Sequence, residues 1–129
     1  MLLGSQSRVL VIDDDDGVRQ TVAELLTYEG YVVDQARDGA EGLERLQCGP
    51  RPDAIILDLM MPVLDGWEFR ERQLTTSAAT VPTIIFSAAR ASLPPPHAGL
   101  DGDAFLAKPF DIDRLLCVVA DCCGHGQRH

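Results

Sequence analysis

Long hydrophobic runs, a basic leader and an excess of positive charge are all missing from this 129-residue sequence. No apolar stretch approaches the roughly 20 residues of a transmembrane helix, and residues 1–7 lack the basic and apolar regions of a signal peptide. Acidic side chains outnumber basic ones by 20 to 11, for a net charge of −9. Such a surface repels phosphate backbones and anionic lipids. We therefore expect no direct binding to nucleic acid or membranes, and a cytoplasmic location.

Cysteine is also sparse, with four residues, three of them in a late apolar segment. Without a secretory signal, reduced thiols are the expected state. Cys122, Cys123, His125 and His129 match no standard zinc spacing and lie at a chain end. We interpret the cysteines as core-facing or exposed thiols.

What the sequence does contain is a regular alternation of short apolar runs and amphipathic segments. The strongest runs are Val9–Ile12, Ala54–Leu57 and Thr83–Phe86, and weaker ones are Tyr31–Val33 and Ala104–Leu106. Unbroken apolar runs of this length are typical of strands that are covered on both faces. Strands that alternate with helices indicate an α/β fold, with a doubly wound, five-stranded parallel sheet and helices on both faces.

Helical periodicity is present in the first three segments between these predicted strands. Asp16 is a candidate N-cap for a first helix, which Gly30 ends, and a second helix precedes Gly49-Pro50. A third opens near Asp65-Gly66. Its apolar stripe is poorer than the others, because polar residues interrupt it: Arg70, Glu71 and Gln73.

The last helix is expected from about Asp111 to Cys123. Its inward face should consist of Ile112, Leu115, Leu116 and Val119. Before it, residues 90–99 contain Pro94-Pro95-Pro96 where a fourth helix would be expected. Proline inside a helix removes a hydrogen bond and clashes with the preceding turn, at about 3 kcal/mol. We predict a degenerate fourth helix there, as a mostly irregular loop.

Polar side chains stand where the predicted strands end. The first ends in Asp13 and Asp14, the third in Asp58, the fourth in Ser87 and the fifth in Lys108. If the strand order is 2-1-3-4-5, the first and third strands are neighbours, about 4.8 Å apart, and the three carboxylates come together. A hard divalent cation, Mg²⁺ (or Mn²⁺), suits such a pocket. With the lysine and the hydroxyl it would form a phosphoryl-transfer site around a nucleophilic Asp58.

Four motifs make the sequence similar to the receiver domains of two-component response regulators, the flavodoxin-like fold of the single-domain chemotaxis regulator. They are Val9–Asp14, Ile56–Gly66, Pro82–Ala88 and Phe105–Phe110, in the family's order and with family-like spacing. The resemblance covers about residues 8 to 121. We expect a receiver domain at 8–123, between a disordered N-terminal tail at 1–7 and a C-terminal tail at 124–129.

The resemblance implies a role for each acidic residue. Asp58 matches the phosphoacceptor and is also a metal ligand. Asp14 matches the direct carboxylate ligand of the metal, and the backbone carbonyl of Met60 matches the third protein ligand. Asp13 matches the acidic partner of Asp14, which contacts the metal largely through water.

The resemblance also implies a switch and a signalling partner. Ser87 matches the hydroxyl residue that hydrogen-bonds the phosphoryl group, and Lys108 matches the lysine that pairs with it. Phe105 matches the aromatic that turns inward on phosphorylation. The phosphoryl group would come from a sensor histidine kinase or a histidine phosphotransfer protein, and the altered surface would bind a downstream protein. Both a stand-alone receiver and a part of a larger protein fit the sequence.

Other functions fit the sequence less well. A phosphatase of the haloacid dehalogenase type needs an acid/base aspartate two residues after Asp58, where Met60 stands, and a cap domain for which the chain is too short. An EF-hand starting at Asp13 needs glycine where Val18 stands. A phosphate-independent docking module that keeps a relic site remains an alternative. We expect a signalling domain and not an enzyme in the usual sense, with only self-phosphorylation from a phosphodonor and self-dephosphorylation.

Overall fold

The computed structural model describes residues 7–58, 66–76, 79–87, 104–107 and 110–124, and for residues 66, 67, 87, 104, 105 and 107 the backbone alone. Strands and helices alternate along this part of the chain. Their bounds are β1 (Arg8–Ile12), α1 (Asp16–Tyr28), β2 (Val32–Ala36), α2 (Gly39–Cys48), β3 (Ala54–Asp58), α3 (Gly66–Gln73), β4 (Thr83–Ser87), β5 (Ala104–Ala107) and α4 (Ile112–Cys122).

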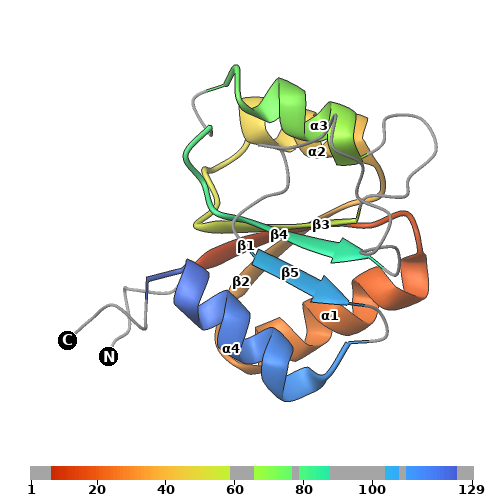
Figure 1. Ribbon diagram of the computed structural model, residues 1–129, viewed down its shortest axis with the longest axis vertical. Coiled ribbons are helices and arrows are strands. Elements are labelled where there is room, and N and C mark those ends of the chain that lie inside the picture. The colour runs from red at the N-terminus through yellow and green to blue at the C-terminus, as the bar shows by residue number, and fades with distance from the viewer. Residues whose placement is uncertain (1–6, 59–65, 77–78, 88–103, 108–109, 125–129) are drawn as a thin grey trace.

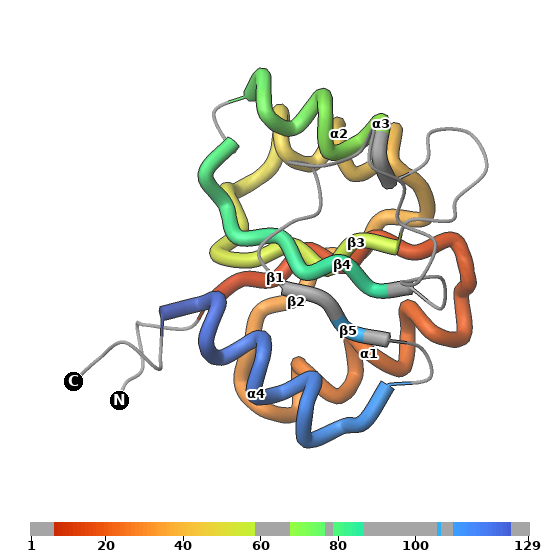
Figure 2. Tube along the Cα trace, viewed as in Figure 1, coloured from red at the N-terminus to blue at the C-terminus, as the bar shows by residue number. Residues whose placement is uncertain are grey.

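The strands form one parallel sheet in the order β2-β1-β3-β4-β5, as the sequence predicts. β1 and β3 are neighbours, and their register pairs Val9 with Ala54 and Ile12 with Leu57. Figure 1 shows α2 and α3 on one face of the sheet and α1 and α4 on the other, and the same layers are seen along the chain trace in Figure 2. The doubly wound α/β prediction is confirmed.

Each face of the sheet has its own core, because successive strand residues point to opposite sides. In β1, Leu10 and Ile12 pack in the cluster that includes Leu43 of α2 and Phe69 of α3. The alternate residues of β1 pack in a second cluster, which also includes Val22 of α1 and Leu115 of α4. Because both faces are covered, polar groups of the central strands reach solvent only at the strand ends.

The prediction that Asp16 caps the first helix is wrong by one residue. Asp15 has an extended backbone (φ −83°, ψ 108°), and its Oδ1 accepts a hydrogen bond from the backbone N of Val18 at 3.1 Å. Asp16 is the first residue of α1, where the positive end of the helix dipole favours a carboxylate. At the other end Gly30 adopts φ +102°, a conformation that suits glycine, and the helix stops there as predicted.

The last helix keeps its predicted place but not its whole predicted inner face. Leu115 and Val119 are buried, whereas Ile112 is 49% exposed. Ile112 lies in the first turn of α4, one turn before Leu115, which is the first buried residue of the helix. The irregular loop predicted for residues 90–99 lies outside the described residues. No described helix combines the length and the apolar character that crossing a bilayer requires.

Two of the three polar residues that interrupt the stripe of α3, Arg70 and Gln73, are buried, which the sequence did not suggest, whereas Glu71 is exposed. Arg70 donates from Nη1 to Oε1 of Gln73 at 2.9 Å and to Oγ1 of Thr83 at 3.1 Å. Gln73 in turn donates to the carbonyl of Val81 at 3.4 Å. The Nε of Arg70 is buried and has no hydrogen-bond partner among the described residues. We call Arg70, Gln73 and Thr83 the α3 polar network.

Gly42 lies where α2 comes closest to the sheet and to α3. A Cβ added there would lie 2.7 Å from Cδ1 of Ile12 and 3.0 Å from Cε1 of Phe69, both fully buried. Overpacking outweighs the better helix propensity of alanine, so we expect Gly42→Ala to lower the free energy of unfolding by about 1 to 2 kcal/mol. Urea denaturation measures the change.

Gly17→Ala is the matched control for that measurement. Gly17 is also helical, but a Cβ there would meet only Oδ1 of Asp15, at an ordinary 3.4 Å. Its stability should be unchanged or higher. Equal midpoints for the two variants would show that the contact at Gly42 is not tight.

The burial of the four cysteines is compatible with the interpretation of core-facing or exposed thiols. Cys48 and Cys117 are exposed, while Cys122 and Cys123 are half-buried. Burial, and next the nearby Asp53 carboxylate, raise the pKa of the Cys123 thiol to about 11. Burial is also the main cause that raises the pKa of Tyr31 to about 12, followed by the charge of Cys123.

These shifts predict a loss of stability at alkaline pH. A thiol whose pKa is raised by folding favours the folded state while it is neutral, and that contribution is lost as pH rises from the ordinary value of 9.0 toward about 11. Cys123→Ala should therefore flatten the decline of the unfolding midpoint across this window. Cys117→Ala, at an exposed thiol, should leave the decline as it is. If both variants decline like the parent, Cys123 does not contribute.

Candidate functional site

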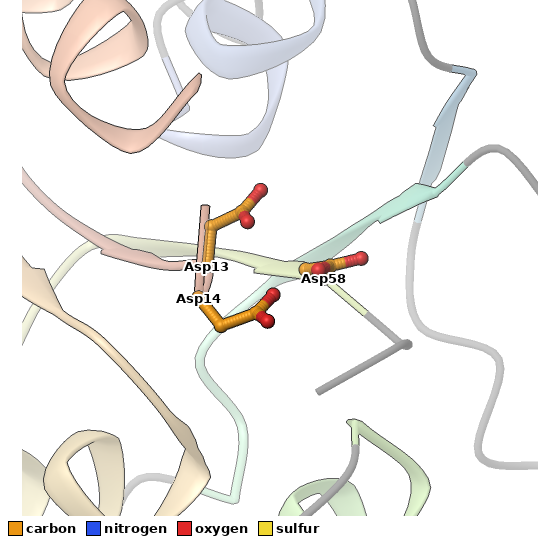
Figure 3. Close-up of side chains that lie close together, drawn as sticks. All are labelled: Asp13, Asp14 and Asp58. Atoms are coloured by element: carbon orange, nitrogen blue, oxygen red, sulfur yellow. The ribbon is translucent and has the colours of Figure 1, made fainter. Parts of the chain in front are cut away.

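Three carboxylates meet at one edge of the sheet. Asp13 and Asp14 directly follow β1, and Asp58 is the last residue of β3. Because β1 and β3 are parallel neighbours, their carboxyl ends lie side by side. One oxygen from each side chain lies within 4.8 Å of the others. Figure 3 shows the three side chains extending from these two strand ends into the same region.

The three carboxylates differ in burial and therefore in what they can do. Asp13 is 1% exposed and Asp58 is 3% exposed, whereas Asp14 is exposed to solvent. Oδ1 of Asp13 accepts a hydrogen bond from the backbone N of Asp15 at 2.9 Å, which ties this side chain to its own loop. Asp14 can thus meet an ion that arrives from solvent, while Asp13 lies behind it.

The cluster fits a hard divalent cation. Mg²⁺ binds oxygen ligands at about 2.0–2.1 Å, so two oxygens on the same ion are at most roughly 4.2 Å apart. Oxygens within 4.8 Å of one another come close to that limit, so small side-chain rotations would bring them into range, and a carboxylate that stays farther away could bind through one of the waters that Mg²⁺ retains. Without a cation, three carboxylates at this separation repel one another. The donor set, three oxygen-bearing acids with no sulfur or nitrogen, matches Mg²⁺ or Mn²⁺.

Arg19 is a residue at this site that the sequence analysis missed. Its side chain is 7% exposed, and its Nη1 donates to the carbonyl oxygen of Asp13 at 2.9 Å. Nη2 pairs with Oδ1 of Asp16 at 2.6 Å, and Nε donates to Oε1 of Gln35 on β2 at 3.1 Å. Its position could have indicated this, because Arg19 lies three residues before Val22, on the buried face of the predicted helix.

The other predicted site residues are placed by the backbone only or lie outside the described residues. Ser87 ends β4, one residue beyond Phe86, which is in register with Asp58 of the neighbouring strand. Phe105 lies in β5, in register with Ile85. The side chains of Ser87 and Phe105, and all of Met60 and Lys108, fall outside what the structure describes.

One contact links the strand that carries Ser87 to the segment before the last helix. The rings of Phe86 and Phe110 meet edge to face, with centroids 5.6 Å apart and an interplanar angle of 67°. Such pairs add about 0.5–1.5 kcal/mol beyond their burial. The end of β4 is thereby packed against the start of the α4 region.

The family follows from comparison with known proteins. The sequence pattern described as "Response regulator receiver domain" matches residues 9–120. The chain belongs to the response regulator receiver family. Receiver domains are signalling modules, and phosphorylation-based signalling is the general role of the family.

Named relatives agree with this assignment. Response regulator MprA of Mycobacterium ulcerans is 44% identical over 111 residues, which are 84% of this chain and 47% of that protein. The chain thus spans about half the length of the curated relatives it matches. Among solved structures, the chemotaxis response regulator CheY4 of Vibrio cholerae has a TM-score of 0.83 and 30% identity, covering 92% of this chain and 99% of that one. The receiver domain of Francisella response regulator 1452 also has a TM-score of 0.83 and 30% identity, covering 94% and 99%.

Family membership places the acidic cluster in a known context. Receiver domains generally bind Mg²⁺ at an acidic pocket, and the cluster of Asp13, Asp14 and Asp58 is such a pocket at the expected edge of the sheet. Response regulators in general act together with sensor kinases. In open α/β sheets, ligands bind beyond the carboxyl ends of the strands, and the acidic cluster lies at that edge of this sheet.

Proposed function

We propose that this receiver accepts a phosphoryl group on Asp58, from the phosphohistidine of a sensor histidine kinase or a histidine phosphotransfer protein, and changes its surface in response. The observation that carries the proposal is the meeting of Asp13, Asp14 and Asp58, with an oxygen of each within 4.8 Å of the others. Bringing three like charges together does not help the chain to fold. Their repulsion destabilises this arrangement unless a cation occupies the pocket.

In this proposal each residue has one task. A carboxylate oxygen of Asp58 attacks phosphorus, an O–P bond forms, the P–N bond of phosphohistidine breaks, and the departing imidazole takes up a proton. Asp14, Asp58 and the Met60 carbonyl would hold Mg²⁺, and Asp13 would act through water. When bound, the ion neutralises charge that develops on the phosphoryl oxygens. Lys108 pairs with the same oxygens.

The switch follows from the same site. Ser87 hydrogen-bonds the phosphoryl group on Asp58, and Phe105 turns inward when the hydroxyl moves. The position of Ser87 at the end of β4, next to the strand that ends in Asp58, supports this assignment. The altered surface would bind a downstream protein, and the receiver would act in the cytoplasm. The domain itself would extend over residues 8–123, slightly beyond the matched range.

The second candidate function, a docking module that works without phosphate, makes a different prediction in one experiment. The protein is incubated with a small phosphodonor such as acetyl phosphate, with Mg²⁺ or with a chelator, and its intact mass is read. A base-labile, acid-stable adduct that forms only with Mg²⁺ supports the receiver. No adduct, from the small donor or from a kinase, would leave the docking module as the better description.

The phosphoryl group should persist for a comparatively long time. Hydrolysis of an acyl phosphate needs a water molecule in line with the O–P bond. In the family, the side chains two residues past the acceptor and two past the hydroxyl residue influence that water. Here they are Met60 and Ala89, neither of which is a general base. We expect Met60→Asn or Ala89→Glu to speed decay by at least about threefold, a modest share of what a positioned base can supply.

The decay is followed by intact mass after the phosphodonor is removed. Met61→Asn is the control, because it introduces the same polar group one position away. If the parent loses its adduct faster than both Met60→Asn and Ala89→Glu, these positions do not govern the lifetime.

A further inference from the structure

We propose that Arg19 is a positioning residue for the metal-binding carboxylates, acting through the backbone between Asp13 and Asp14. This inference rests on the proposed function, since it concerns how the same acidic site is held in shape. Arg19 touches neither the phosphoryl group nor the metal in this proposal. Its task is to hold the loop that presents the ligands.

The contacts of Arg19 join three separate parts of the fold. Its guanidinium donates to the Asp13 carbonyl in the loop after β1 at 2.9 Å, to Asp16 in the first turn of α1 at 2.6 Å, and to Gln35 on β2 at 3.1 Å. All three guanidinium nitrogens are used, each on a different acceptor. We call this set the Arg19 clamp. Lysine cannot reproduce it, since an ammonium group is a single point and not a planar fork.

The clamp acts on the peptide that joins two of the three acids. The Asp13 carbonyl belongs to the peptide bond before Asp14, so holding that oxygen fixes the direction in which Asp14 leaves the backbone. The same loop is held at two further points. The backbone N of Asp13 donates to the carbonyl of Ala36 at 3.2 Å, and the Asp13 carboxylate accepts from Asp15 at 2.9 Å.

Mg²⁺ places strict geometric requirements on the loop that supplies its ligands. It requires near-ideal octahedral geometry at short distances, and supporting contacts that orient its ligands typically change affinity by about 10- to 100-fold. The Arg19 side chain is 7% exposed and hydrogen-bonded through every guanidinium nitrogen, so it is well suited to hold the ligands in a fixed orientation. The acidic cluster is therefore supported by the contacts of Arg19 as well as formed by its three carboxylates.

Charge and geometry make opposite predictions for Arg19, which allows a decisive test. The positive charge repels a cation, and the paired Asp16 carboxylate offsets this only in part. If Arg19 acted by charge alone, Arg19→Met would strengthen Mg²⁺ binding and Arg19→Lys would leave it unchanged. If Arg19 positions the loop, both variants weaken it, and Arg19→Lys does so with the charge retained.

The readout is the rise of the thermal unfolding midpoint with Mg²⁺ concentration, which reports affinity without any reaction. We expect Arg19→Lys to weaken Mg²⁺ binding by about tenfold. Gln35→Leu removes the acceptor of Nε, and we expect it to weaken binding by about threefold. In the double variant the two effects should not multiply, because both changes release the same clamp.

Arg8→Lys is the matched control. Arg8 also pairs with an aspartate, Asp34, through Nη1 at 2.7 Å, but it lies at the opposite end of β1. It should change stability without changing Mg²⁺ affinity. As a second readout, excess Mg²⁺ should restore the phosphorylation rate of Arg19→Lys to that of the parent, which general structural damage would not allow.

The outcomes separate the two proposals. If the parent binds no Mg²⁺, the proposed function fails and this inference fails with it. If the parent binds Mg²⁺ and both Arg19→Lys and Gln35→Leu bind it equally well, the positioning role alone is overturned. Should Arg19→Lys not fold, Gln35→Leu decides, since it leaves Arg19 in place: weaker Mg²⁺ binding supports the clamp and unchanged binding overturns it.

Discussion

Asp58→Asn should leave a folded protein that forms no phosphoryl adduct with acetyl phosphate and Mg²⁺. The carboxamide has nearly the shape of the carboxylate but cannot serve as the nucleophile, so the reaction is removed rather than slowed. The change also eliminates one of three charges whose oxygens lie within 4.8 Å of one another. In the absence of Mg²⁺ we therefore expect the variant to be more stable than the parent by about 1 kcal/mol.

Intact mass and thermal unfolding measure these two effects. Asp113→Asn is the control, because Asp113 is an exposed aspartate on α4 and lies outside the cluster. It should keep both the adduct and the stability of the parent. An undiminished adduct on the Asp58→Asn protein would show that another side chain is the phosphoacceptor.

Asp14→Ala should abolish most of the Mg²⁺ response. Asp14 is the exposed member of the cluster, so it can meet the ion and remove part of its hydration shell. With one fewer carboxylate, an ion that gives up its waters reluctantly has little to gain from the site, and we expect affinity to fall by roughly tenfold or more. Adduct formation should fall with it at moderate Mg²⁺ concentrations.

The rise of the unfolding midpoint with Mg²⁺ measures the loss. In the parent it should be clear, and in Asp14→Ala nearly absent, although the variant starts from a higher midpoint because repulsion is reduced. Asp121→Ala changes an exposed aspartate near the end of α4 and should respond to Mg²⁺ like the parent. Identical Mg²⁺ responses in Asp14→Ala and the parent would contradict the assignment of Asp14 as a ligand.

Much of the fold and the acidic cluster could be predicted from sequence because the signals are strong and local. Each central strand is an unbroken apolar run, and such runs leave few alternatives to a sheet covered on both faces. Once strands one and three are neighbours, the aspartates that follow them must meet at one edge. The prediction therefore depended on strand order and not on any detail of side-chain conformation.

The remaining features depended on contacts that sequence patterns do not contain. Charged side chains are usually exposed, so the burial of Arg70 was unexpected, and for Arg19 the helical position alone, on the buried face, pointed to burial without indicating its acceptors. Each of them is accommodated by acceptors that lie far away in sequence, Gln35 for Arg19 and Thr83 for Arg70. The helix boundary at Asp15 was missed for a different reason, since adjacent aspartates are equally good caps and only backbone geometry distinguishes them.

The α3 polar network constrains how this sequence can change over evolutionary time. Changing Thr83 or Gln73 alone to an apolar residue would leave the buried Arg70 with fewer acceptors, at a cost of about 1–3 kcal/mol. Replacing all three with apolar side chains of similar volume would be close to neutral or stabilising. Sequences with only one or two of these substitutions are thus less stable than the sequence with none or with all three. The three positions should therefore change together. Descendants of this chain are expected either to keep the whole set or to have lost it together.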